Sequence, residues 1–104
     1  MDELIKAYHE MMKKYELVYE KIRVHTDELI KRELDSREEQ VSELKEMHWA
    51  PRLEEKMIKT IVDGSEKLIL KYREDAEETI EHMRKKDSAL TASLLGIPDP
   101  LADS

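Results

Sequence analysis

The chain has 104 residues, no cysteine and a formal net charge of −7, from 25 acidic and 18 basic residues. Its length suits a single domain, and the lack of cysteine excludes disulfides and thiolate metal sites. Charged residues make up 41% of the chain and aromatic residues only 5%, with two glycines and three prolines. This composition favours amphipathic helices over strands.

Charges of both signs are interleaved along the chain. Residues 1–34 hold eight acids and seven bases, and residues 51–88 hold ten acids and nine bases. The excess of acids lies in residues 35–50 and in the last residues of the chain. Direct nucleic-acid binding needs a basic face, so we expect none.

The sequence gives no sign of a membrane segment or a leader. Its longest apolar run, residues 68–70, is too short for membrane insertion. The first residues lack the positive and apolar regions of a cleaved signal peptide. We therefore expect a cytoplasmic protein, with export by a route without such a signal left open.

The first predicted helix covers residues 2–47. Apolar positions recur in it at alternating spacings of four and three residues, a pattern that predicts a seam against a partner helix. They are Leu4, Tyr8, Met11, Tyr15, Val18, Ile22, His25 and Leu29. The repeat slips near Asp35 and Ser36, where a capping box would let a new helix start. Because no glycine or proline is present there, we predict a continuous or gently bent helix.

A chain reversal is predicted at residues 48–51. Proline disfavours helical geometry in the residue before it and suits the first turn of a helix, so Pro51 should open the second helix. Trp49, the only tryptophan, lies at the reversal. One interpretation is that it packs into the end of the hairpin. The other is that it stays exposed and contacts a partner, since tryptophan is common at binding hot spots.

The second predicted helix covers residues 51–88 and carries the same repeat. Its seam positions are Ile58, Val62, Ser65, Ile69, Tyr72, Ala76, Thr79 and Met83. Asp63 and Gly64 form a turn signal, but the repeat keeps its phase across them. We therefore predict a continuous helix in which Gly64 allows a close approach.

The character of the chain changes after residue 88. Residues 88–95 are uncharged and suit two more helical turns or a short extra helix, and Gly96 is a natural stop. We expect residues 97–104 to be extended or mobile. The domain organisation is thus a hairpin over residues 1–88 and a helical extension with a flexible tail over residues 89–104.

No pattern of catalytic or metal-binding residues emerges. The four histidines lack the Glu-x-x-His spacing of helical metal sites, and no glycine-rich phosphate loop or nucleophile motif is present. We expect no enzymatic activity, no cofactor and no metal. His25 on the seam is interpreted as a packed polar residue, with a pH-sensitive role as the alternative.

Three places are candidates for binding a protein partner. Tyrosine and methionine are favoured at contact surfaces that are partly apolar and partly exposed to water. Several of them share a face of the first helix. The apolar tail could dock on a partner as it becomes ordered. Ordinary core packing and a frayed terminus are the alternatives. The candidate residues are Tyr8, Met11, Met12, Tyr15, Tyr19, Trp49, Leu94, Leu95 and Ile97.

The midpoint tryptophan and the stretch before it carry a resemblance. Residues 41–49, Val-Ser-Glu-Leu-Lys-Glu-Met-His-Trp, and Met83 followed by Asp87 resemble the W-x-G family of small helical-hairpin substrates of type VII secretion. This chain has Pro51 where that family has glycine, and Met83 where it has an aromatic residue. The resemblance implies a non-enzymatic hairpin that pairs with a like or unlike partner and is exported with it.

Together these features predict an all-α fold: a long antiparallel helical hairpin that pairs into a helical bundle. A two-helix hairpin hides only one stripe of each helix, so we expect a homo-dimer or a hetero-oligomer with a protein partner. The expected function is non-catalytic protein–protein interaction or assembly. The alternative is a small regulator or inhibitor, for instance phage-encoded, that docks on a larger protein through its acidic turn and tail.

Overall fold

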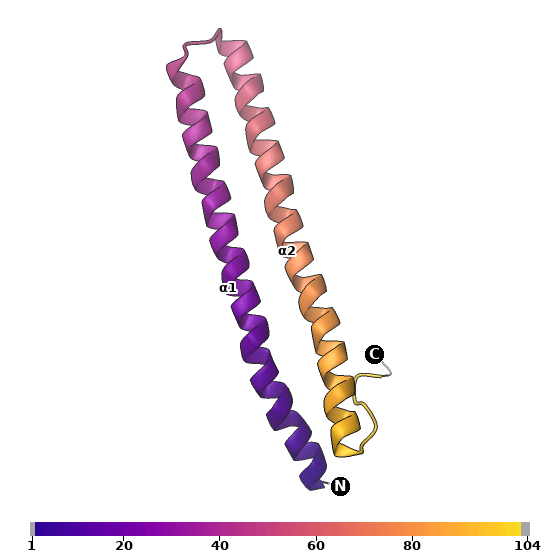
Figure 1. Cartoon of the computed structure of the whole chain (residues 1–104). Coiled ribbons are helices and arrows are strands. Elements are labelled where there is room, and N and C mark those ends of the chain that lie inside the picture. The colour runs from indigo at the N-terminus through magenta and orange to yellow at the C-terminus, as the bar shows by residue number, and fades with distance from the viewer. Residues whose placement is uncertain (1, 103–104) are drawn as a thin grey trace. The chain divides into compact units, whose positions relative to one another are not determined.

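The computed structural model describes residues 2–102. Two helices, α1 (Asp2–Glu46) and α2 (Pro51–Leu95), account for nearly all of them, and none of the described residues forms a strand. The chain is an all-α helical hairpin (Figure 1), as the sequence predicts. No helix in the described part is both long and apolar enough to cross a membrane.

Helix α1 is continuous through residues 35–36, which confirms the prediction of an unbroken helix. Asp2 and Glu3 lie in its first turn and Lys45 in its last. These charges complement the partial charges at the helix ends. Since neither glycine nor proline interrupts this segment, the slip in the repeat changes which side chains face inward without breaking the backbone.

The reversal between the helices lies where the sequence predicts it. The backbone amide of His48 donates to the carbonyl of Lys45 over 3.3 Å, and His48 has a left-handed φ of 54°. Pro51 opens α2, and the amide of Glu54 donates to the carbonyl of Ala50 over 2.9 Å. Proline suits this place because the first helical N–H would have no partner within the helix.

Helix α2 passes unbroken through Gly64, as predicted. A Cβ added at Gly64 would meet nothing within 4 Å. The prediction that Gly64 permits a close approach within the hairpin is therefore wrong. The phase of the repeat predicted the helix correctly, whereas it could not tell whether a neighbouring backbone would lie against the glycine.

Gly96 ends α2 in a Schellman motif. The amide of Gly96 donates to the carbonyl of Ser93 over 3.2 Å, and the amide of Ile97 donates to that of Ala92 over 3.0 Å. Gly96 has a φ of 67°, which glycine adopts without the clash that a Cβ would cause. The turns expected after Ser88 are thus the end of α2 itself.

Residues 97–102 fold back on the end of α2, where the sequence predicts an extended or mobile segment. Asp99 organises this return: the Ser88 hydroxyl donates to its carboxylate over 2.5 Å, and the Leu101 amide over 2.9 Å. The carbonyl of Asp99 accepts from the amide of Ala102 over 3.1 Å. Residues 103 and 104 of the predicted tail lie outside the described residues.

The chain divides into two compact units, each containing part of both helices. We call residues 2–24 with 76–102 the terminal unit, and residues 25–75 the turn unit. The buried side chains of the terminal unit are those of Tyr8, Met12, Tyr19, Ala76, Ile80, Ser88, Thr91 and Ala92. Those of the turn unit are Thr26, Ile30, Leu44, Ser65 and Ile69.

The predicted seam is partly wrong in register. Val18 is 45% exposed, and the side chain of His25 is 68% exposed. Their neighbours Tyr19 and Thr26 are buried instead. The seven-residue spacing itself is kept, because every second predicted position faces inward while the positions between them shift by one residue. The inward positions in this part of α1 are Tyr8, Met12, Tyr15, Tyr19, Ile22 and Thr26.

Candidate interaction surface

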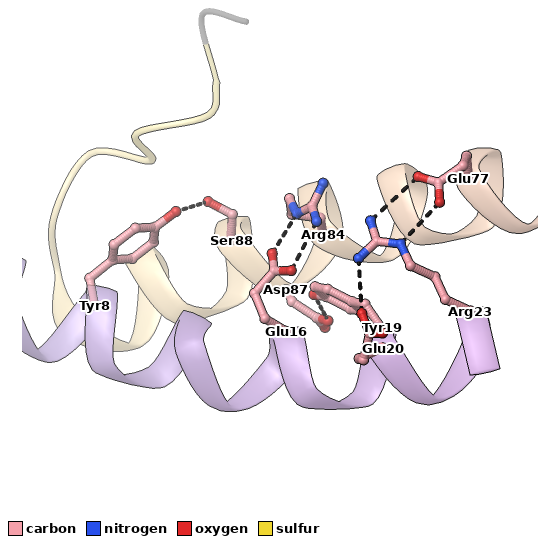
Figure 2. Close-up of polar contacts among 9 residues, drawn as sticks. All are labelled: Tyr8, Glu16, Tyr19, Glu20, Arg23, Glu77, Arg84, Asp87 and Ser88. Atoms are coloured by element: carbon pink, nitrogen blue, oxygen red, sulfur yellow. Dashed lines mark hydrogen bonds and ion pairs between the residues drawn. The ribbon is translucent and has the colours of Figure 1, made fainter.

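A chain of buried hydroxyls joins α1, α2 and the folded-back segment of the terminal unit. Tyr8 Oη and Ser88 Oγ lie 2.5 Å apart, and Ser88 Oγ lies 2.5 Å from Asp99 Oδ1 (Figure 2 shows the Tyr8–Ser88 contact). A carboxylate can only accept, so Ser88 uses its single proton on Asp99. Tyr8 must then donate to Ser88. This ordered relay fixes the three segments in one register.

A second buried hydroxyl, that of Tyr19, donates to Asp87 Oδ2 over 2.5 Å. The guanidinium of Arg84 lies over the Tyr19 ring, 5.4 Å from its centre. Burial, together with the adjacent Asp87 carboxylate, raises the pKa of Tyr19 well above its ordinary value. The phenol is therefore held as a neutral donor, which gives it a structural role.

Two ion pairs connect the helices of the terminal unit on one side of the seam (Figure 2). Arg84 binds Glu16 through two contacts, of 2.7 and 3.0 Å, and Arg23 binds Glu77 through contacts of 3.0 and 3.4 Å. Hydrogen bonds from the arginines lower the pKa of both glutamates. All four side chains are partly exposed, so the pairs add little stability but mark this side as hydrated.

The opposite side of the seam is apolar. On α1, Leu4, Met11 and Val18 are spaced by seven residues and fall on the other side of the buried stripe from Glu16 and Arg23, given 3.6 residues per turn. On α2, Met83 and Leu90 likewise fall on the other side of the buried stripe from Glu77 and Arg84. Because the ion pairs place the charged flanks of both helices together, the two apolar flanks share the other side. We call this surface the apolar flank: Leu4, Met11, Val18, Met83 and Leu90.

The apolar flank is poorly covered by the chain itself. Leu4 is 39% exposed, Val18 45% and Leu90 53%, while Met11 and Met83 are half-buried. None of the five carries a charge. By contrast, a shallow groove of about 760 Å³ along α1 includes five charged side chains in its lining, those of Asp2, Lys6, Glu10, Lys13 and Glu16. The apolar flank is thus the better candidate for contact with another protein.

The tyrosine and methionine residues proposed from the sequence divide between core and surface. Tyr8, Met12 and Tyr19 are buried within the terminal unit, and Met11 and Tyr15 are half-buried. Only Met11 belongs to the apolar flank. Binding of a partner by this group stays a prediction, and burial makes Tyr8, Met12 and Tyr19 the least accessible members.

The remaining predicted contacts lie at the two ends of the helices. Trp49 is 41% exposed at the reversal, and Leu94 is 78% exposed near the end of α2, whereas Leu95 and Ile97 are half-buried. The turn unit also contains a groove of about 450 Å³, whose lining does not include Trp49. Its lining residues are Leu44, Leu53, Lys56, Met57, Thr60 and Ile61.

Sequence reasoning missed the polar residues that join the helices. Ser88 and Asp99 lie 11 residues apart, and Glu16 and Arg84 lie 68 apart. No local pattern singles them out, because each is one of many polar residues on a helix of this composition. The register of the hairpin, counted from the reversal at residues 48–51, is the only signal that could have brought Glu16 and Arg84 together.

Within residues 2–102, no three histidine, aspartate or glutamate side chains come together as a metal site would require. Glu78 and His82 are both exposed. Comparisons with protein-family models, curated protein sequences and solved structures find no match to this chain.

Proposed function

We propose that this chain is a non-catalytic helical protein that acts by protein–protein interaction or assembly. The observation that carries the proposal is the apolar flank, in which Leu4, Val18 and Leu90 stay at least 39% exposed. Exposed apolar side chains that gather on one side of a protein and are bordered by polar residues are typical of an interaction site. A secretion-type hairpin that is exported with its partner is one form of this function.

The mass and helicity of the isolated chain test the proposal. We expect either association into a species heavier than the 12.3 kDa chain, or single chains whose helices are partly melted without a partner. Light scattering after size exclusion gives the mass, and circular dichroism gives the helicity. A single chain that is fully helical and unfolds cooperatively at micromolar concentration would contradict the proposal.

A small regulator that docks on a larger protein through its turn is the second candidate. It is supported by Trp49, which is exposed beside Met47, itself 63% exposed, and by the groove that includes Leu53 and Met57. In this case we expect Trp49→Ala to weaken partner binding while helicity is kept. Loss of helicity in that variant would assign Trp49 to the core.

A further inference from the structure

The chain exposes more surface than a compact protein of its mass. Its accessible surface is 8210 Å², and a compact 12.3 kDa monomer exposes roughly 6,100 Å². The excess is about 2,100 Å², and obligate dimers bury roughly 1,000–2,500 Å² from each partner. The excess matches in size the area that one protomer of a permanent dimer buries.

The chemistry of the apolar flank suits contact with itself. In a two-fold interface the same patch meets itself, so a charge at its centre would meet its own copy. The five residues of the flank, Leu4, Met11, Val18, Met83 and Leu90, are all uncharged. Exposed Lys14 and Lys86 lie along the outer edge of the flank, where long side chains cover apolar surface while their charges stay in water.

The flank also has the form that a helical bundle needs. It presents one ridge from α1, with Leu4 and Val18, and one from α2, with Met83 and Leu90. Two ridges on one copy can pack into the grooves of two helices on another copy. We propose that the apolar flank of the terminal unit binds the same flank of a second copy of this chain, which makes a four-helix contact. This inference rests on the proposed function and names its partner.

Two single glutamate substitutions, one on each helix, test the apolar flank. We expect Val18→Glu and Leu90→Glu to weaken association by roughly a hundredfold or more, because each places two carboxylates in an apolar contact. Leu17→Glu and Ala89→Glu are matched controls, since both positions are exposed next to a flank residue but point away from the flank. The controls should keep twice the 12.3 kDa chain mass in light scattering, with helicity checked in every variant.

A thiol-protection experiment keeps the test independent of folding defects. The chain contains no cysteine, so Val18→Cys introduces a single thiol with little change in volume. Its reaction with a small thiol reagent should slow as the protein concentration rises, because association covers residue 18. The thiol of Leu17→Cys should react at the same rate at every concentration.

The outcomes separate this inference from the proposed function. A wild-type single chain with partly melted helices would overturn self-pairing and leave an unlike partner in its place. A fully folded single chain would overturn both. A dimer that survives Val18→Glu and Leu90→Glu, with no protection of the thiol in Val18→Cys, would place the interface elsewhere and overturn the assignment of the flank.

Discussion

The terminal unit and the turn unit use the same two helices but hold them together differently. In the terminal unit, hydroxyls and ion pairs cross between α1 and α2: Tyr8 to Ser88, Tyr19 to Asp87 and Glu16 to Arg84. In the described turn unit, Thr26 aside, no side-chain hydrogen bond or ion pair joins the helices. Directional contacts specify a register, whereas apolar packing alone tolerates sliding.

The turn unit also leaves charged residues of its inward stripe without ion pairs. Glu33 and Arg37 are half-buried and neither forms one with another described residue, whereas the half-buried Glu16 and Arg84 of the terminal unit bind each other. Among the described residues, each unit holds one buried hydroxyl without a partner, that of Ser65 in the turn unit and that of Thr91 in the terminal unit. The comparison teaches that the terminal unit sets the alignment of the hairpin and that the turn unit should open at a lower free energy.

The largest expected effect on stability comes from truncating one buried isoleucine to alanine in each unit. Ile80 is fully buried in the terminal unit, and Ile69 is 8% exposed in the turn unit. We expect Ile80→Ala to lower the free energy of unfolding by about 3 kcal/mol and Ile69→Ala by about 2 kcal/mol, because the looser unit can relax around the cavity. Urea unfolding followed by circular dichroism measures both. An equal or larger loss at Ile69 would remove the difference between the units.

The next effect concerns the relay at Asp99. Asp99→Ala removes the acceptor of Ser88 and of the Leu101 amide, and hydrogen bonds to a charged group contribute about 1.5–3 kcal/mol. We expect a loss of about 2 kcal/mol and faster hydrogen exchange at the Leu101 amide. Ser88→Ala removes the same hydrogen bond from the donor side. The double variant should therefore lose less free energy of unfolding than the sum of the two single variants. Additive losses would show that the relay does not act as a unit.

Much of the fold could be predicted from the sequence because the signals are local. Pro51 and Gly96 mark a helix start and a helix end through their own backbone preferences, and the apolar repeat shows that both segments are helical. The inward register was predicted less well. Val18 and Tyr19 are both apolar enough to face a partner, and either one fits the alternating spacing of three and four residues between Tyr15 and Ile22. Packing against α2, which the spacing does not contain, decides which of them is buried.

The candidate surface was less predictable because it depends on contacts distant in sequence. Tyr8, Met12 and Tyr19 look like a binding face in isolation, and only packing against α2 shows that they are core. The exposure of Leu4 and Val18 has the same origin, since α2 covers one side of their helix and not the other. Composition correctly indicated uncovered apolar surface and could not say which residues form it.

A smaller effect is expected at Tyr19, with a pH dependence that identifies it. Because burial raises the pKa of Tyr19, the folded state favours the neutral phenol. This contribution is complete below the ordinary pKa near 10 and is lost as the pH rises above it. We expect Tyr19→Phe to cost about 1.5 kcal/mol at neutral pH and to flatten the fall in stability above pH 10. Urea unfolding of the wild type and of Tyr19→Phe, from neutral pH to above pH 10, measures both effects.

The smallest expected effect compares the two glycines, one in each unit. Gly64 has open space around its Cα and lies inside a helix, so Gly64→Ala should raise the free energy of unfolding by about 0.8 kcal/mol. Gly96 has a φ of 67°, so Gly96→Ala should lower it by about 1 kcal/mol. Urea unfolding of both variants gives the two signs. If Gly64→Ala were instead destabilising, and more so at higher protein concentration, the open space beside Gly64 would be filled by another chain, and the turn unit would take part in association as well.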